Sequence, residues 1–290
     1  MGLSIFTTKI KIMILIADSG STKTSWTLLS GKDVKTCETS GFNPYYMGSE
    51  EIERILSEEL DELHGKAEIR EVFYYGSGCS TEKNCAVVSQ ALSKHCPGAH
   101  IEVNHDLLAA ARSLLGHSEG IACILGTGAN SCAYNGKEIT KNVPSLGYMF
   151  GDEGSGAYIG KKFLESYLKG KLAIEINEAF IKEYNYSLSD ILGRVYGDKN
   201  PSAFMASFTH FLAKHEHHDD VREILYQAFI DFFQESVSKY ERYKMIPVSF
   251  VGSVAYHFRH ILNEAAWEMG ISVGQIEQAP MDGLIQYHSI

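Results

Sequence analysis

The chain lacks any long apolar run and carries little positive charge. No stretch reaches the roughly 18 consecutive apolar residues that a membrane-spanning helix needs. The net charge of −10, with a pI near 5.6, removes any general attraction to nucleic acids and to anionic membranes. We therefore expect neither a nucleic-acid partner nor a membrane partner, and local groups must bind any phosphate.

Cysteines in C-x-x-C spacing, the usual arrangement of paired metal ligands, are also missing. Several cysteines lie in apolar runs, where a free thiol behaves as a small hydrophobic group. This distribution predicts a cytoplasmic protein in a reducing compartment, with neither a zinc site nor a disulfide framework. The six are Cys37, Cys79, Cys85, Cys96, Cys123 and Cys132.

Several well-known motifs are absent or incomplete. No G-x-x-x-x-G-K-[ST] sequence occurs, which argues against a P-loop enzyme. Residues 126–131, GTGANS, fall short of G-x-G-x-x-G and precede an expected strand, which argues against a dinucleotide-binding fold. Residues 1–11 do not have the form of a signal peptide, and we expect a strand extension or a loose tail. A histidine-rich stretch matches no tetrahedral metal site and favours a solvated loop; it contains His210, His215, His217 and His218.

The most informative stretch present is 12–29, IMILIADSGSTKTSWTLL. Its apolar ends predict two strands, and its small polar centre predicts a hairpin loop. Glycine lets the backbone approach a ligand, and consecutive N–H groups can hold an anion. Asp18 suits the cation that accompanies such an anion, although an ordinary polar hairpin remains an equal alternative. The loop residues are Gly20, Ser21, Thr22 and Lys23.

The same arrangement occurs a second time. Residues 120–125 form an apolar run, Gly126-Thr127-Gly128 follows, and residues 131–134 begin another strand. Two such units predict two like-built halves, whose loops could hold a triphosphate from both sides. The length of 290 residues also suits two domains.

The expected strands and helices predict an α/β protein with helices on the faces of a mixed sheet. We place the first domain at residues 1–116 and the second at 117–279. A helical insertion is expected at about 160–245, and the terminal helix at 280–290 could join the first domain.

Three further places could carry chemistry. Asp106 follows an expected strand and is a candidate general base, although by itself a helix cap is the stronger interpretation. Asp152, which lies with Glu153 between two glycines, suits sugar hydroxyls or a metal-bound water, or else forms an acidic helix start. Gly252-Ser253 lies between a strand and a helix, where the backbone can approach a nucleotide, or else forms a plain turn.

Taken in order, these segments resemble the BadF/BadG/BcrA/BcrD ATPase family, and within it the N-acetylglucosamine kinases of the actin, hexokinase and acetate kinase superfamily. The resemblance covers the chain from residue 13 to its end. It is carried by DSGSTKT at 18–24, NHD at 104–106, GTGAN at 126–130, GDEGSG at 151–156 and VGSV at 251–254.

The resemblance implies two ribonuclease-H-like domains, as in the actin-like ATPases, that close on ATP in an interdomain cleft. It implies Mg²⁺ at Asp18 and a general base at Asp106. The implied nucleotide-binding residues are Gly20, Ser21, Thr22, Lys23, Thr127, Gly128, Gly252 and Ser253. The implied sugar-binding residues are Asn43, Asp106, Gly147 and Asp152.

The expected activity is an ATP-dependent phosphotransfer to an N-acetylhexosamine, above all from ATP to the 6-hydroxyl of N-acetylglucosamine, in a homodimer. One departure concerns the sugar pocket, because Leu146 stands where these kinases often have a tryptophan. An iron–sulfur activator ATPase is the first alternative, but no cysteine follows Cys132 to supply cluster ligands. A catalytically weak sugar- or nucleotide-binding sensor is the second.

Overall fold

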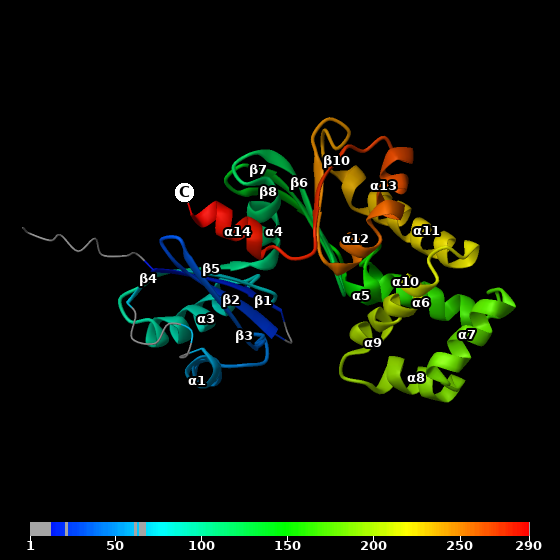
Figure 1. Ribbon diagram of the computed structural model, residues 1–290, viewed down its shortest axis with the longest axis horizontal. Helices are drawn as coiled ribbons and strands as arrows, with labels where there is room; N and C mark the ends of the chain where they lie inside the picture. The colour runs from blue at the N-terminus through cyan, green and yellow to red at the C-terminus, as the bar shows by residue number, and fades with distance from the viewer. Residues whose placement is uncertain (1–12, 21–22, 61–62, 64–67, 290) are drawn as a thin grey trace, which may run out of the picture. The chain divides into compact units, whose positions relative to one another are not determined.

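The computed structural model of the chain is shown in Figure 1. The described residues are 13–20, 23–60, 63 and 68–289. The predictions made for Ser21, Thr22 and residues 1–11 therefore lie outside the described residues. Among the described residues, no helix is long and apolar enough to cross a membrane.

The chain divides into two compact units. One comprises Met1–Ala109 and Met281–Ile290, and the other comprises Ala110–Pro280. The division falls inside the helix Asp106–Leu115, whereas the sequence places the boundary at 116–117. The C-terminal segment groups with the first unit because its helix packs on that unit's sheet.

The first unit contains a five-stranded sheet with the order β3-β2-β1-β4-β5. Strands β1, β2 and β3 pair antiparallel, whereas β4 and β5 run parallel to β1. The strands are β1 (Met13–Ser19), β2 (Lys23–Ser30), β3 (Asp33–Ser40), β4 (Ile69–Gly76) and β5 (His100–His105). The helices are α1 (Ser49–Glu59), α3 (Glu82–His95), α4 (Asp106–Leu115) and α14 (Met281–His288).

Strand β1 is covered on both faces, which explains its continuous apolar run. Leu15 and Ala17 pack into the cluster that contains the apolar sides of α1 and α3. Ile16, whose side chain points to the opposite face, packs with Ala109 of α4 and Leu284 of α14. Burial on both faces holds the end of β1, where Asp18 lies, in a fixed place.

The second unit repeats this topology. Its sheet has the order β10-β9-β6-β7-β8, with β6, β7 and β8 antiparallel and with β9 and β10 parallel to β6. The expectation of two like-built α/β halves is therefore correct. The strands are β6 (Glu119–Leu125), β7 (Ala129–Asn135), β8 (Ile139–Val143), β9 (Val248–Val251) and β10 (Val273–Glu277).

Most of the second unit's helices lie between β8 and β9. They are α5 (Gly147–Phe150), α6 (Gly156–Leu168), α7 (Ile174–Tyr184), α8 (Leu188–Gly197), α9 (Pro201–Ser207), α10 (Thr209–Lys214), α11 (Asp219–Glu235) and the 3₁₀ turn η1 (Val237–Lys239). Two more, α12 (Ser253–His257) and α13 (Arg259–Glu268), follow β9. The helices between β8 and β9 lie within the region of about 160–245 where the sequence predicts a helical insertion, apart from α5, which precedes it.

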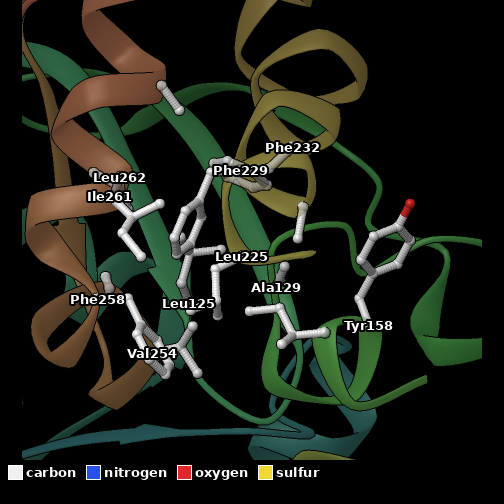
Figure 2. Close-up of a cluster of buried hydrophobic side chains, with 14 of the residues drawn as sticks. Leu125, Ala129, Tyr158, Leu225, Phe229, Phe232, Val254, Phe258, Ile261 and Leu262 are labelled. Atoms are coloured by element: carbon white, nitrogen blue, oxygen red, sulfur yellow. The ribbon is translucent and has the colours of Figure 1, made fainter. Parts of the chain in front are cut away.

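One apolar core joins the second sheet to these helices. Leu125 of β6 packs among side chains of α11, α12 and α13, including Phe229, Val254 and Ile261 (Figure 2). The end of β6 is thus anchored where the Gly126-Thr127-Gly128 loop begins. Both predicted loops therefore follow the central strand of their own sheet.

Candidate active site

In the first unit, three predicted site segments lie at one edge of the sheet. Strands β1, β4 and β5 are parallel neighbours, so their carboxyl ends share that edge. In the register, Ser19 pairs with Gly76, and Gly76 pairs with His105. Asp18 therefore lies one residue before this row and Asp106 one residue after it. Parallel strands bring acids from distant parts of the sequence together in this way.

The two carboxylates influence each other's ionisation. Burial, and then the negative charge of Asp106, raise the pKa of Asp18 to about 6, while Lys23 lowers it. Burial also raises the pKa of Asp106, against the opposing effects of His105 and of the backbone N–H of Leu107. Asp106 thus also bonds to the start of α4, so helix capping and a chemical role are compatible. A bound cation would reduce the electrostatic repulsion between these two buried acids.

Asn43 lies at the same edge, in the turn after β3. Its Oδ1 accepts the backbone N–H of Tyr45 at 3.0 Å, which orients the amide. Gly78, in the turn after β4, has a φ of +92°, and a Cβ there would lie only 2.6 Å from Oδ1 of Asn43. Glycine is therefore required for the Asn43 amide to sit against this turn.

In the first loop, the structure describes Gly20 and Lys23. The N–H of Gly20 donates to the carbonyl of Lys23 at 2.9 Å, closing the turn between β1 and β2. The Lys23 ammonium bonds to Glu38 at 2.6 Å on the exposed side of β2 and β3. An exposed ion pair of this kind is worth little, so a phosphate could compete for the lysine.

In the second unit, two of the four predicted nucleotide-binding residues border one cavity, and Gly128 and Gly252 are not among its walls. Thr127 of the loop after β6 and Ser253 at the start of α12 both border it. The cavity has a volume of about 390 Å³, within the range of small-molecule sites. Its other walls are Gly126, Gly156, Ala203, Ala206, Ser207, Thr209, His210, Ala213, Val254, His257 and Phe258.

The loop that borders this cavity is held on two sides. Its carbonyls at Gly126 and Thr127 accept N–H groups from Gly156 and Ala157 at the start of α6, at 2.8 and 3.0 Å. Gly252, which directly follows β9, packs against this loop and has a φ of +126°. A Cβ at Gly252 would lie 2.3 Å from the carbonyl oxygen of Leu125. Only glycine fits such a close backbone approach.

Asp152 lies beside this loop and is buried, with 8% of its surface exposed. Its Oδ1 accepts the backbone N–H of Ala129 at 3.2 Å, and a Cβ added at Gly128 would lie 3.2 Å from its Oδ2. Burial raises the pKa of Asp152, while the N–H of Ala129, Ser145 and the charge of Lys161 lower it. Asp152, which is predicted to bind the sugar, therefore lies next to the predicted phosphate loop.

The segment before Asp152 has a strained backbone that is held by hydrogen bonds. Leu146 and Asp152 have positive φ values, 61° and 56°, which are unusual for residues other than glycine. The N–H of Asp152 donates to the carbonyl of Ser145 at 2.9 Å, and Lys161 of α6 donates to the carbonyl of Tyr148 at 3.1 Å. Strained backbone of this kind often marks a functional segment. Gly147 begins the short helix α5 in this segment and is exposed.

Sequence reasoning missed the α9–α10 side of the cavity. The sequence identified only the loops and the β9–α12 turn as nucleotide-binding. A stripe of small residues, Ala203, Ala206, Ser207 and Ala213, recurs at helical spacing, and this signal could have indicated a face that leaves room for a ligand. The other members of the wall depend on how α9 and α10 pack beside the loop.

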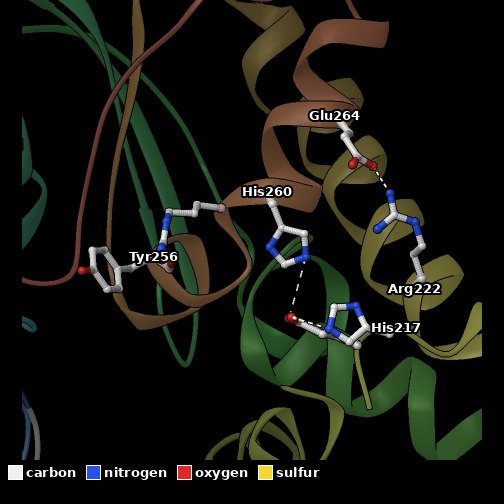
Figure 3. A network of polar contacts seen from close by, with 7 residues as sticks. His217, Arg222, Tyr256, His260 and Glu264 are labelled. Carbon is white, nitrogen blue, oxygen red and sulfur yellow. Dashed lines mark hydrogen bonds and ion pairs between the residues drawn. The ribbon is translucent and has the colours of Figure 1, made fainter. Parts of the chain in front are cut away.

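The histidine-rich stretch is divided by the structure. His210 lines the cavity, whereas His217 lies away from it beside Glu216. One carboxylate oxygen of Glu216 is 3.8 Å from Nε2 of His217, and the other is 3.8 Å from Nε2 of His260 on α13 (Figure 3). Arg222 and Glu264 form a further ion pair between α11 and α13. Among the described residues, no group of three or more histidines, cysteines or acids could hold a metal.

Solved sugar kinases share this architecture. A Porphyromonas gingivalis protein, provisionally named an N-acetylglucosamine kinase, is 43% identical, with a TM-score of 0.91 over 96% of this chain and 99% of that chain. A Chromobacterium violaceum protein with the same provisional name is 17% identical, with a TM-score of 0.73 over 96% and 99%. A ROK-family glucokinase from Streptomyces griseus, solved with glucose and AMPPNP, is 12% identical, with a TM-score of 0.58 over 95% and 97%. At these identities the latter two show the fold alone.

No protein-family model matches the chain, and no curated protein does. The structural likeness confirms the prediction of an α/β protein with two ribonuclease-H-like domains. With 43% identity over nearly the full length of both proteins, the chain belongs to the same family as the Porphyromonas gingivalis protein, that of sugar kinases with the actin-like ATPase fold, which are phosphotransferases with an alcohol acceptor.

Proposed function

We propose that the protein transfers the γ-phosphoryl group of ATP to the 6-hydroxyl of N-acetylglucosamine. The observation that carries this proposal is that the carboxylates of Asp18 and Asp106 are neighbours at the carboxyl edge of the first sheet. Phosphoryl transfer needs little from a protein beyond positioning and neutralisation of charge, and a base for the attacking hydroxyl. The name given to the Porphyromonas gingivalis relative supports the same acceptor.

Asp106 is the proposed general base. Its burial raises its pKa, so its carboxylate accepts a proton more readily than an exposed aspartate would. It takes the proton of the 6-hydroxyl as that oxygen bonds to phosphorus. The backbone N–H of Leu107 holds the carboxylate in place during this step.

Asp18 is the proposed partner of Mg²⁺. Its carboxylate is desolvated and repelled by Asp106, so a cation here would lower the electrostatic cost of both acids. When bound with ATP, Mg²⁺ would neutralise charge on the phosphate oxygens. Asp18 would hold the cation near the first loop, where the Gly20 N–H bonds to the carbonyl of Lys23.

The second unit is the proposed nucleotide and sugar-positioning half. Thr127 and Gly128 would donate to phosphate oxygens, and Gly252-Ser253 would adjoin the adenosine in the cavity. Asp152 would accept sugar hydroxyls, as Asn43 and Asp106 would from the first unit. Exclusion of water would follow from closure of the domains on both substrates.

We also propose a cytoplasmic homodimer. In the part of the chain that the structure describes, the six cysteines form no disulfide bond, which suits a reducing compartment. Sedimentation velocity of the purified protein would measure the oligomeric state directly, and a monomer at micromolar concentration would contradict the dimer.

The test of the proposed function is ADP release with ATP, Mg²⁺ and a panel of sugars. The panel is N-acetylglucosamine, glucosamine, N-acetylmuramic acid, N-acetylmannosamine and glucose, with 6-deoxy-N-acetylglucosamine as the matched control. We expect N-acetylglucosamine to give the highest kcat/KM and the 6-deoxy sugar to release no ADP above background. Leu146 offers no aromatic surface to the sugar, and loss of such a surface weakens binding by about 1–3 kcal/mol. The KM for the sugar should therefore be higher than in kinases that have a tryptophan at this position.

Two results would contradict this function. If glucose exceeds every N-acetylated sugar, the amino-sugar assignment is wrong. If no sugar stimulates ADP release while ATP still binds, the protein is a sensor rather than a kinase.

A further inference from the structure

The cavity of the second unit contains two hydroxyl groups whose protons are already committed. Oγ of Ser207 donates to the carbonyl of Phe204 at 2.7 Å, and Oγ1 of Thr209 donates to the carbonyl of Ala206 at 2.7 Å. Both side chains line the cavity. Since a hydroxyl has only one proton, each can offer a ligand only an acceptor lone pair.

The break between α9 and α10 explains why these protons are committed. At this break the N–H of Phe208 donates to the carbonyl of Met205, three residues back, instead of to Phe204, four residues back. The Ser207 hydroxyl takes the place of that N–H at the Phe204 carbonyl. Turning the hydroxyl toward a ligand would remove this bond from the helix end, where carbonyls otherwise lack helical partners.

Four other polar side chains line the cavity. Thr127 and Ser253 belong to the loop and the helix start that the proposed function gives to phosphates and ribose. His210 and His257 carry imidazoles, each of which can donate or accept according to its tautomer. The remaining side chains of the α9–α10 and α12 walls are apolar, among them Ala206, Val254 and Phe258.

We propose that Ser207 and Thr209 select the adenine base, because they accept hydrogen bonds from its exocyclic amino group. In a base with a carbonyl at the same position, the carbonyl oxygen would face the two hydroxyl oxygens of Ser207 and Thr209. All three atoms would be acceptors, so the carbonyl oxygen would have no hydrogen bond to these residues. This inference rests on the proposed nucleotide site and adds the residues that determine which nucleotide enters it. Both residues come from the α9–α10 wall, which no sequence motif identified.

Inosine nucleotides present a carbonyl at position 6 and therefore test this selection. Adenine and hypoxanthine differ only in the amino or carbonyl group at position 6 and in the proton on the adjoining ring nitrogen. Guanine is a poorer probe, since its second amino group could bond to the same acceptors. The measurement is competition of ADP and of IDP against a fluorescent nucleotide on the full-length protein with Mg²⁺, without any sugar.

We expect ADP to bind about tenfold more tightly than IDP, which is the usual effect of one hydrogen bond that is lost and left unpaired. In the double variant Ser207→Ala, Thr209→Val, the preference should fall to about threefold or less, since neither acceptor remains. The matched control is Ser93→Ala, whose hydroxyl makes the same kind of bond to a helical carbonyl, on exposed α3 in the first unit. It should keep the wild-type ratio.

The ratio of the two affinities separates selection from stability. Loss of the bonds to Phe204 and Ala206 could lower the melting temperature, but lower stability alone would weaken ADP and IDP equally. Equal binding of ADP and IDP to the wild-type protein would overturn the proposal, even if the variants failed to fold. An unchanged preference in the double variant would overturn it as well.

These outcomes are independent of sugar phosphorylation. If no sugar is phosphorylated, the proposed kinase function fails, yet the ADP and IDP competition still decides the role of Ser207 and Thr209.

Discussion

The Asp152 carboxylate accepts the backbone N–H of Ala129 at 3.2 Å. This bond connects the strained segment before α6 to the loop that follows β6, two places that lie 23 residues apart in the chain. This buried acid therefore orients the loop after β6, the proposed phosphate loop, through Oδ1, and the Ser145 side chain also hydrogen-bonds to the carboxylate. A carboxylate has about four lone-pair sites, so it keeps acceptor capacity for the proposed sugar hydroxyl. An asparagine at position 152 would keep Oδ1 and replace the second carboxylate oxygen by an NH2 group.

Asp152→Asn and Asp152→Ala should consequently affect the two substrates differently. The asparagine keeps an acceptor for the Ala129 N–H, so the KM for ATP should stay close to wild type while the KM for the sugar rises about tenfold. The alanine removes both acceptors, so both KM values should rise. Steady-state kinetics with each substrate varied in turn would measure the difference. Equal effects of the two variants on the KM for ATP would contradict the assigned division of roles.

Asp106→Asn should abolish most turnover while leaving nucleotide binding intact. General base catalysis commonly contributes about 10²–10⁴-fold to the rate, and the cavity-lining residues all belong to the other unit. Single-turnover kinetics and a nucleotide titration would measure the two effects. Asp282→Asn is the matched control, because Asp282 is an exposed acid in the first turn of α14. Turnover within a factor of about three of wild type would remove Asp106 from the role of base.

Asp18→Asn should stabilise the protein in the absence of ligand at about pH 8. The pKa of Asp18 is raised from 3.8 to about 6, so the folded state holds this proton more tightly than the unfolded state does. Stability from this group is therefore present below about pH 4 and is lost as the pH rises through about 6. The gain in the variant should be about 1–3 kcal/mol at pH 8 and should vanish near pH 4.

Thermal melts of wild type and Asp18→Asn at both pH values would test this, with Asp282→Asn as the control. With a non-hydrolysable ATP analogue and Mg²⁺, the order should reverse, since only the wild type has the carboxylate that favours the cation. A variant that is less stable than wild type at both pH values would show that burial does not raise the pKa of Asp18.

Gly252→Ala should destabilise the second unit far more than Gly170→Ala. Both glycines have positive φ values, 126° and 62°, but a Cβ at Gly252 would strike the backbone of Leu125, whereas one at Gly170 would meet nothing within 4 Å. We expect losses of about 2–4 kcal/mol and about 1 kcal/mol respectively. Calorimetry would resolve the transition of the second unit. Equal losses would mean that the loop after β6 yields to an added methyl group.

Substrate binding should make the protein more compact. Asn43 and Asp106 belong to the first unit and Asp152 to the second, so a sugar that contacts all three requires the units to close on it. Small-angle scattering with N-acetylglucosamine and a non-hydrolysable ATP analogue should show a smaller radius of gyration than the protein alone. The Asp152→Ala variant should show less compaction, and an unchanged radius in the wild type would argue against closure.

The sequence by itself determined the elements whose signals are local. Apolar runs such as 12–16 and 120–125 predicted buried strands, and the small polar residues after them predicted loops. Both signals are local, because the burial of a strand and the conformational freedom of a glycine are evident within a few residues. The repeat of this pattern predicted two like-built halves, which the two sheets have. The resemblance then placed Asp18, Asp106 and Asp152 in named roles.

The tertiary structure alone decided which side chains meet. Lys23 pairs with Glu38 on the neighbouring strand, Asp152 bonds to Ala129, and the α9–α10 helices place Ser207 beside the loop at Thr127. Each of these contacts joins residues far apart in sequence, and each depends on strand register or helix packing, which a local pattern does not specify. The charge and hydrogen-bonding character of the site therefore follow from packing, while the positions of its loops follow from sequence.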